Sequence, residues 1–534
     1  MKKTKAIAIL GTGSDVGKSI VAAALCRSLA DRGIRVAPFK AQNMSNNSGI
    51  TAEGLEMGRA QIVQAEAAGV APHVDMNPVL LKPTGEKGSQ VVLNGKAFKN
   101  CTAMDYYDKK KSLFNEVCKA YDRLSARFDL IVLEGAGSCA EVNLMPLDIV
   151  NFRMAEYAEA DVILVADIHR GGVFGQIVGT LECIPEKYRN MIKGFIINRF
   201  RGDISLFKDG VDWIEKKTGK DVFGVLPWYN HFRIDAEDSV EIENCQKISS
   251  SIDKSKPAIG VVKLPHISNF TDFHALSKIK DLQLMFIENP ADFLRFRDMF
   301  NAIILPGSKN TRMDILWLKK TGWDKIIKQY AESPEGHVLG ICGGFQMLGE
   351  YVDDPEGTED KPGRTKGLGL LPVKTVIQSP KTTTLSSFSW NGKRGEGYEI
   401  HMGFTEPVTT EPVTTEPVTT EPVTTEPDKG SALFKVNARN GEKCNDHDGC
   451  ITEDKKIAGT YMHGMFDSDE IRSAWLELVG IKSPASGISM DKKDSTTGIS
   501  GKDRDYALLK EHFEKHIDFN KIIKNTGITV NSGN

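Results

Sequence analysis

The sequence predicts an α/β protein built from two domains, each with a mostly parallel sheet. Short and continuously apolar segments, which are typical of strands buried on both faces, alternate with helical patterns. The strands expected in the first domain are residues 6–10, 35–39, 130–134, 162–167, 194–198 and 222–226. A second series of strands is expected at residues 258–262, 284–287, 302–306 and 338–341. With 534 residues the chain is too long for one ordinary hydrophobic core, which agrees with two domains.

Composition divides the chain further. We expect a first domain over 1–235, a polar linker over 236–256 and a second domain over 257–480. The second domain contains repeated copies of EPVTT at 406–427, where recurrent proline favours a solvated, extended surface insertion. Residues 481–534 are expected to form a variable loop and a C-terminal helix.

Bulk properties exclude several classes of function. The formal net charge is -3, so no overall basic field points to nucleic acid. The nine cysteines are few and unpatterned, which argues against a disulfide framework. There is no apolar run of the length that a membrane span needs. We therefore expect a cytoplasmic protein that acts on small molecules, and the sequence does not indicate its oligomeric state.

The segment LGTGSDVGKS has the composition of a phosphate-binding loop. It follows an apolar segment and precedes an apolar helical pattern. Gly13 and Gly17 would let backbone N–H groups turn towards phosphate oxygens. Lys18 would balance the phosphate charge, and the hydroxyl of Ser19 would reach Mg²⁺. A threonine stands where the strict motif has its first glycine, but the order of strand, loop and helix still predicts nucleotide binding.

Two residues at strand ends could complete this site. Glu134 ends the segment LIVLE, and an acid at such a place beside a phosphate loop can hold Mg²⁺ together with Ser19. Lys40 follows the second strand and could contact the γ-phosphate or an acyl phosphate. The alternative for Glu134 is a glutamate in a turn with no metal, and the alternative for Lys40 is a solvated lysine at a strand end. Together GTGSDVGKS and VLEGAG resemble the dethiobiotin synthetase-like P-loop ATPases. The resemblance implies that ATP phosphorylates a substrate carboxylate and that an amine then attacks the acyl phosphate.

The segment VLGICGGFQMLGE carries a second centre. Cys342 lies between glycines at a predicted strand-to-helix turn, the geometry of a nucleophile elbow. Backbone N–H groups around Gly344 could hold an oxyanion, and the helix behind the thiol favours thiolate. His463 follows a later apolar segment and could serve as the base. This pair resembles the class I glutamine amidotransferases, which implies a flavodoxin-like domain. The resemblance also implies that the backbone of the loop ILPGSKNT helps to form the oxyanion hole, with Gly307 as the contributing residue.

One position departs from that family. The usual triad has a glutamate two residues after the histidine, whereas this chain has Met465 there. Glu399 and His401, in the segment GYEIHMG, could supply the acidic partner instead. The alternative is that both belong to a strand that merely lines the site.

The two halves together resemble a family of corrinoid-amidating enzymes, the cobyric acid synthases. The resemblance rests on PFKAQNMSNNS, GRAQIVQAEAAGVAPHVDMNPVLLKP, VADIHRGGVFGQIVGT and GFIINRFRGD. It implies amidation of carboxylates b, d, e and g of adenosylcobyrinic acid a,c-diamide, each step using one ATP and one glutamine. Two alternatives stay open: a cobyrinic acid a,c-diamide synthase, and a non-corrinoid ATPase or scaffold joined to an amidotransferase-like domain.

Several charged residues of the first domain are further candidates for substrate contacts. Glu53 or Glu56, and Asp167, could touch a metal ion or a substrate carboxylate. The arginines that could pair with corrinoid carboxylates, because guanidinium groups bind them bidentately, are Arg170, Arg199 and Arg201. Ordinary surface charge is the alternative for each arginine.

Overall fold

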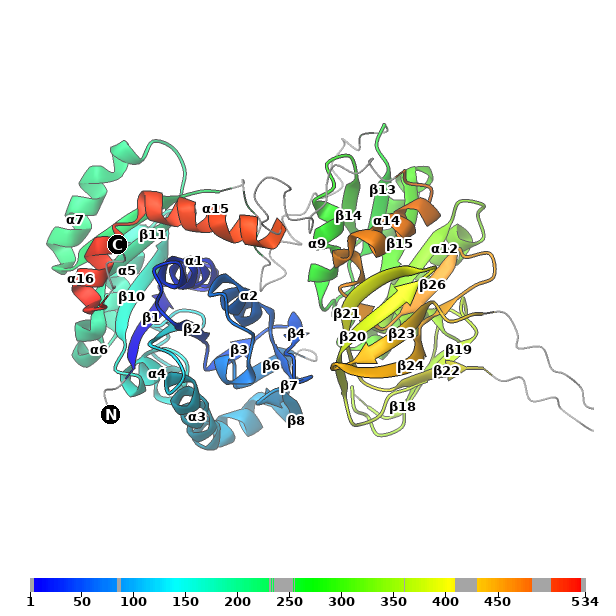
Figure 1. The fold of residues 1–534 in the computed structure, drawn as a ribbon, viewed down its shortest axis with the longest axis horizontal. Coiled ribbons are helices and arrows are strands. Elements are labelled where there is room, and N and C mark those ends of the chain that lie inside the picture. The colour runs from blue at the N-terminus through cyan, green and yellow to red at the C-terminus, as the bar shows by residue number, and fades with distance from the viewer. Residues whose placement is uncertain are drawn as a thin grey trace, which may run out of the picture. The chain divides into compact units, whose positions relative to one another are not determined.

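The structure is a computed structural model (Figure 1). It describes residues 4–83, 88–229, 232, 234, 253, 255–359, 361–408, 430–482 and 501–529. The chain forms two compact units. The first unit comprises Met1–Lys82, Gly88–Glu237 and Met490–Asn534, and the second comprises Asp238–Ser489 with Pro83–Lys87. Most of the expected linker, of the EPVTT insertion and of the variable loop lies outside the described residues.

A six-stranded parallel sheet forms the centre of the first unit. Its strands, in spatial order, are β12 (Asp221–Pro227), β11 (Ile192–Phe200), β10 (Asp161–Asp167), β1 (Lys5–Gly11), β9 (Leu130–Glu134) and β2 (Val36–Phe39). All six match strands expected from the sequence. Alternate residues of β1 enter different cores: Ile7 and Ile9 on one face, Ala8 and Leu10 on the other.

Helices cover both faces of this sheet. One face packs against α1 (Lys18–Ala30), α2 (Arg59–Ala67) and α15 (Gly501–His516). The other packs against α3 (Ala103–Ser125), α4 (Phe152–Tyr157), α5 (Val173–Cys183), α6 (Glu186–Met191) and α7 (Lys208–Thr218). Two small sheets, absent from the sequence-based expectation, follow β2. They contain β3 (Gln42–Met44), β6 (Val79–Pro83), β7 (Gly88–Leu93) and β8 (Lys96–Thr102), and the pair β4 (Ser48–Ile50) and β5 (Glu56–Gly58).

The C-terminal segment returns to the first unit. It contains two helices, α15 and α16 (Phe519–Thr526), where the sequence indicated one. Leu509, Phe513 and Ile522 join the core that α1 shares with the sheet. Ile517 also forms a β-bridge to Gly224 of β12. Helices α15 and α16 are therefore part of the core of the first unit.

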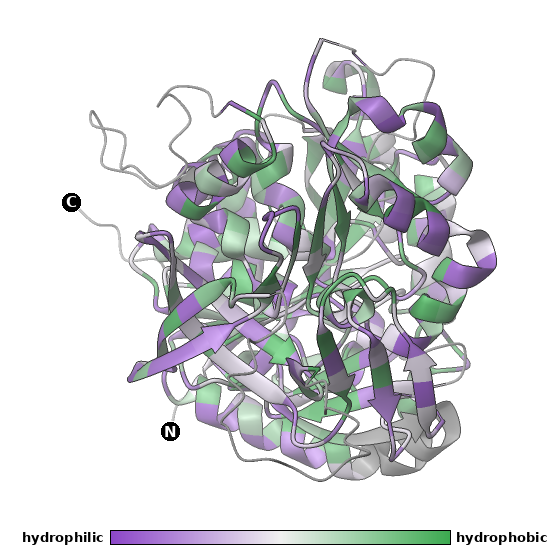
Figure 2. Cartoon of the chain, turned by 90° about the vertical axis from the view of Figure 1, so that its right-hand side faces the viewer, coloured by the Kyte–Doolittle hydropathy of each residue, from purple (hydrophilic) through white to green (hydrophobic). Residues whose placement is uncertain are grey.

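A second six-stranded sheet forms the centre of the second unit, with order β14 (Gln283–Ile287), β13 (Ala258–Val262), β15 (Phe300–Leu305), β16 (His337–Ile341), β26 (Ile457–Thr460) and β25 (Cys450–Ile451). All pairs are parallel except the last. The helices of this unit include α9 (His274–Ser277), α10 (Pro290–Arg295), α11 (Thr311–Thr321), α12 (Trp323–Ala331), α13 (Gly343–Leu348) and α14 (Asp469–Leu478). Figure 2 shows the central strands in green and much of the surrounding helical surface in purple, the pattern of a buried sheet.

Two further sheets, which the sequence did not indicate, complete the second unit, one antiparallel and the other mixed. A five-stranded sheet contains β24 (Glu442–Asp448), β23 (Phe434–Arg439), β20 (Thr382–Trp390), β21 (Lys393–His401) and β27 (Met462–His463). A four-stranded sheet contains β18 (Gly363–Lys366), β17 (Tyr351–Asp354), β19 (Val373–Val376) and β22 (Phe404–Pro407). The first Glu-Pro of the repeat therefore ends an edge strand, where proline removes no needed ladder bond.

The described helices include none with the length and apolar character required to cross a lipid bilayer.

Candidate active sites

The phosphate loop connects β1 to α1 at the carboxyl edge of the first sheet. Gly17 has a φ of 96°, and a Cβ atom there would lie 2.0 Å from Nδ2 of Asn198, so only glycine fits. Asn198 donates from that atom to the carbonyl of Val16 at 2.9 Å. Nζ of Lys18 donates to the carbonyls of Gly13 and Gly137, each at 2.9 Å. The side chain of Lys18 thus folds back over the loop and hydrogen-bonds to the loop backbone.

Glu134 is the centre of a buried polar cluster beside this loop. Its Oε1 accepts from Oγ of Ser19 at 2.7 Å and from Nζ of Lys40 at 3.0 Å. Its Oε2 accepts from the side-chain amides of Gln64 at 2.5 Å and Gln61 at 3.3 Å. Burial opposes ionisation, but Lys40 and the hydrogen bonds outweigh it and lower the pKa of Glu134. The carboxylate therefore stays charged, with one oxygen turned to the loop and the other to α2.

This cluster has the chemistry of a magnesium site. Mg²⁺ prefers hard oxygen ligands, and the Ser19 hydroxyl and the Glu134 carboxylate lie in direct contact. Within the part of the chain that the structure describes, the buried Oε1 of Gln64 has no hydrogen-bond partner, so a further oxygen is left over beside them. These residues fit a hydrated Mg²⁺ ion bound with a triphosphate.

Asp167 and Arg199 join the neighbouring strand ends to the phosphate loop. The guanidinium of Arg199 lies 3.0 Å from Oδ2 of Asp167 and 3.1 Å from Oδ1 of Asp15, a residue of the loop. Arg199 has a φ of 61°, a rare conformation for a residue with a side chain. Its charge is thus balanced by two carboxylates of the protein. Arg170 is exposed, and Arg201 lies over the ring of Trp228 at 4.1 Å from its centroid.

Glu56 has a different environment from the one that the sequence suggested. Its carboxylate accepts from Nζ of Lys82 at 2.7 Å and from Oγ of Ser48 at 2.8 Å. Both charged side chains are almost wholly buried. Glu56 is therefore neutralised within the small sheets, while Glu53 is exposed.

In the second unit, Cys342 occupies a tight turn between β16 and α13. Its φ of 52° and ψ of -109° are strained, as expected of a nucleophile elbow. The turn needs small neighbours: a Cβ atom on Gly344 would lie 2.0 Å from the carbonyl oxygen of Leu305. The amide of Cys342 donates to the carbonyl of Thr460 at 2.7 Å, which ties the elbow to β26.

His463 and Asp272 form a buried pair beside this cysteine. Nδ1 of His463 lies 2.7 Å from Oδ2 of Asp272, and the amide of Gly464 donates to Oδ1 at 3.0 Å. Burial lowers the pKa of His463, but the charges of Asp272 and Cys342 and hydrogen bonds to both outweigh it and raise that pKa to about 10. The pair thus stabilises an imidazolium next to the sulfur. The ring of Tyr398 stacks on His463 at 5.3 Å.

Gly307 lies against the same imidazole. A Cβ atom on Gly307 would be 3.3 Å from Cε1 of His463 and 3.1 Å from Oγ of Ser268. The carbonyl of Gly307 accepts from the amide of Ser268 at 2.9 Å. The loop after β15 therefore enters the site without side-chain bulk, as an oxyanion-binding backbone must.

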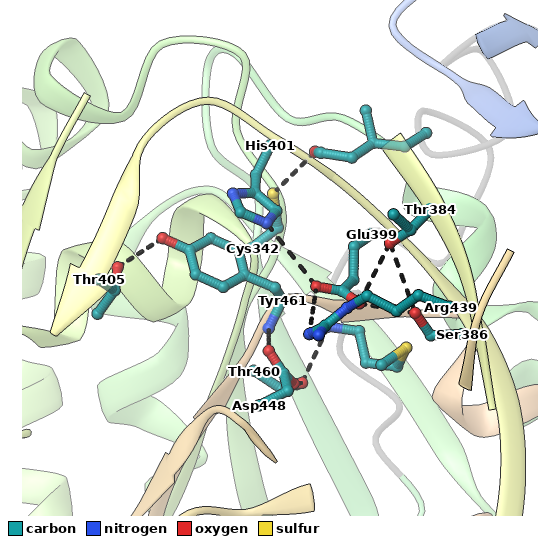
Figure 3. A network of polar contacts seen from close by, with 12 residues as sticks. Cys342, Thr384, Ser386, Glu399, His401, Thr405, Arg439, Asp448, Thr460 and Tyr461 are labelled. Atoms are coloured by element: carbon teal, nitrogen blue, oxygen red, sulfur yellow. Dashed lines mark hydrogen bonds and ion pairs between the residues drawn. The ribbon is translucent and has the colours of Figure 1, made fainter. Parts of the chain in front are cut away.

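A polar network extends from the cysteine through β21 (Figure 3). Sγ of Cys342 lies 3.5 Å from the carbonyl oxygen of Ile400. The ring of His401 stacks on Tyr461 with 3.7 Å between the ring centroids. Burial lowers the pKa of His401. Glu399 accepts from Oγ of Ser386 at 2.7 Å and from Nε of Arg439 at 3.0 Å. Burial opposes its ionisation, yet these donors and His401 hold the pKa of Glu399 at about 2.

Two family models match the chain in agreement with its two units. Residues 7–241 match the CobQ/CobB/MinD/ParA nucleotide binding domain. Residues 258–471 match the CobB/CobQ-like glutamine amidotransferase domain.

Full-length relatives narrow the assignment. The chain is 46% identical over 529 residues to a cobyric acid synthase of Chlorobium phaeobacteroides (strain BS1), which covers 98% of this chain and 99% of that relative. The chain belongs to the cobyric acid synthase family. The cobyric acid synthase of Chlorobaculum tepidum is 44% identical, with 98% of both chains covered. That of Listeria monocytogenes is 45% identical over 466 residues, 87% of this chain and 86% of that relative. The expected nucleotide-binding and amidotransferase domains and the α/β fold are thereby confirmed.

In this member of the cobyric acid synthase family, the acid beside the histidine is not one that the sequence indicated. Glu399 and His401 bind other groups, and Asp272 occupies the position expected of them. Met465 is 1% exposed and belongs to the hydrophobic core. The missed residue lies in SNFTDF, within the short helix η4 (Phe270–Phe273). A single aspartate in a short segment of mixed polarity carries no local signal of catalysis.

Proposed function

We propose that this chain is a glutamine-dependent amidoligase that converts adenosylcobyrinic acid a,c-diamide into adenosylcobyric acid. The supporting observation is that one chain holds both the Ser19–Lys40–Glu134 cluster and the Cys342–His463 pair. The first suits phosphoryl transfer, and the second suits the release of ammonia from an amide. Its relatives are named cobyric acid synthases.

The second unit would supply ammonia. The Cys342 thiolate attacks the side-chain carbonyl of glutamine, and backbone N–H groups near Gly307 and Gly344 bind the oxyanion. His463 gives its proton to the departing ammonia, and Asp272 keeps the imidazolium oriented. Water then attacks the thioester with His463 as base, which releases glutamate and restores the thiolate.

The first unit would activate the acceptor. Lys18 and the loop amides hold the triphosphate, and Lys40 leaves Glu134 to contact the transferred phosphoryl group. An oxygen of the corrinoid carboxylate displaces ADP, and ammonia then displaces phosphate from the acyl phosphate to leave an amide. Ser19 and Glu134 would hold Mg²⁺, which neutralises phosphate charge when bound. Arg170 and Arg201, at the carboxyl ends of neighbouring strands, would pair with the remaining carboxylates of the substrate.

A cytoplasmic location belongs to the same proposal. It rests on ATP as co-substrate and on the seven cysteines whose side chains the structure describes, all of which are free thiols.

Product mass tests the function. The protein is incubated with adenosylcobyrinic acid a,c-diamide, ATP, Mg²⁺ and glutamine, and four successive replacements of OH by NH₂ are expected. Cys342→Ala should amidate with ammonia but not with glutamine. Two amidations of cobyrinic acid itself, with none of the diamide, would assign the sister reaction. No amidation of either substrate despite ATP hydrolysis would refute the corrinoid assignment.

A further inference from the structure

The carboxylate of Asp314 is a buried group that the chemistry above does not use. Asp314 lies in the first turn of α11 and is 0% exposed. Its Oδ2 accepts from Oγ of Ser308 at 2.6 Å, and its Oδ1 lies 2.7 Å from Nδ1 of His266. A buried carboxylate is stable only when its oxygens are hydrogen-bonded. Asp314 meets this need with two residues from two different segments.

Those two segments also bind each other. They form a short antiparallel bridge in which the amide of Ser268 donates to the carbonyl of Gly307, and the amide of Lys309 donates to the carbonyl of His266, each at 2.9 Å. One segment leads within a few residues to Asp272, the partner of His463. The other is the loop that contains Gly307. The bridge therefore joins the triad acid to the oxyanion loop.

The position of Ser308 shows why its orientation matters. A Cβ atom on Gly343 would lie 2.7 Å from the backbone nitrogen of Ser308, so this peptide packs directly against the elbow that carries Cys342. The Ser308 hydroxyl also accepts from the amide of Asn310 at 3.1 Å, and Asn310 caps α11. The peptide is thus held on one side by the elbow and on the other by the start of α11.

We propose that Asp314 is a positioning residue for glutamine hydrolysis, which clamps the segment of Ser308 and the segment of His266 so that the oxyanion loop is held against the Cys342 elbow. This inference rests on the proposed glutaminase function. It adds a residue that touches no substrate and acts through the backbone of the loop.

The electrostatics of the clamp agree with this role. The hydrogen bond to Asp314 raises the pKa of His266, so the ring keeps a proton to donate to the carboxylate. Asp314 thereby accepts from both partners at once. An asparagine would present one oxygen and one amide group, which cannot accept from both.

Variants of the clamp separate positioning from nucleophile formation. Asp314→Asn should lower kcat for glutamine hydrolysis about 100-fold, because a displacement of about 1 Å at the reacting atoms has that effect. Ser308→Ala should lower it about tenfold, since it removes one of the two bonds. Alkylation of Cys342 by iodoacetamide, followed by peptide mass, should stay within about twofold of the wild-type rate because it needs no oxyanion site. Asp324→Asn, a matched charge loss in the first turn of α12, is the control.

A double variant makes the test specific. If Ser308 acts through Asp314, then the double variant should lose no more kcat than Asp314→Asn alone. Additive losses would overturn the proposal, as would kcat values of both single variants close to that of the wild type. A fall in alkylation in proportion to kcat would also overturn it, because the defect would then lie in the nucleophile.

Should Asp314→Asn fail to fold, Ser308→Ala and His266→Asn test the two bonds one at a time. Amidation with free ammonia should be unchanged in every variant, and its absence from the wild type would refute the proposed function instead.

Discussion

Oδ2 of Asp272 lies 2.7 Å from Nδ1 of His463, although the two residues are 191 positions apart in the chain. Both side chains are at most 2% exposed. Asp272 has a second anchor in the amide of Gly464, so both of its oxygens face the turn that carries the histidine. A carboxylate held in this way fixes the tautomer and the direction of the imidazole. The acid that completes the site therefore comes from η4 and not from the residues that follow the histidine.

Asp272→Asn should lower glutamine-dependent amidation by about 10²–10⁴-fold, because the imidazolium loses its counter-charge and the ring loses its fixed tautomer. Amidation with free ammonia should be unaffected, since the first unit is intact. The measurement is product formation with each nitrogen source. Asp353→Asn, which breaks an exposed ion pair with Arg364 in the same unit, is the control. Equal rates for wild type and Asp272→Asn with glutamine would contradict the role of the pair.

The pH profile of glutamine hydrolysis should carry the signature of the same pair. His463 must be protonated to give a proton to ammonia, and its pKa is raised from 6.5 to about 10. The protonated form therefore persists through neutral pH and is lost as the pH rises through about 10, so kcat should decline only there. In Asp272→Asn the declining limb should move towards neutral pH, because one of the groups that raises the pKa is gone. Identical limbs for both proteins would show that His463 is not the group that titrates.

The parts of both sites that are local in sequence could be predicted from it. Cys342 was identifiable because a strained turn between a strand and a helix requires glycines close to the nucleophile, and these are neighbours of Cys342 in the sequence. Glu134 was identifiable because it ends a parallel strand, and Ser19 because it follows the glycine loop at the start of α1. Asp272 was not identifiable, because only the packing of η4 brings it to β27. The same is true of α15, whose return to the first unit depends on tertiary contacts.

Glu134→Gln should abolish amidation with either nitrogen source while glutamine hydrolysis by the second unit continues. The variant removes the charge that faces both Ser19 and Lys40. It also removes the carboxylate that pairs with Lys40, whose side chain is 5% exposed, and breaking a buried pair in this way costs about 3–5 kcal/mol. ADP release and calorimetric unfolding measure the two effects.

A second substitution distinguishes stability from catalysis at this position. Adding Lys40→Met to Glu134→Gln removes the second member of the buried pair, so the unfolding temperature should recover while ADP release stays lost. Recovery of ADP release in the double variant would mean that Glu134 has only a structural role.

Glu56→Gln should destabilise the protein by about 3–5 kcal/mol and leave ATP use intact, because Glu56 belongs to a buried pair with Lys82 and not to the Glu134 cluster. The double variant Glu56→Gln with Lys82→Met should regain most of that free energy of unfolding. Below the unfolding transition, the KM for ATP and the Mg²⁺ dependence should stay within about twofold of the wild type. A large rise in either constant without a loss of stability would instead place Glu56 among the groups that bind the metal or the nucleotide, as the sequence first suggested.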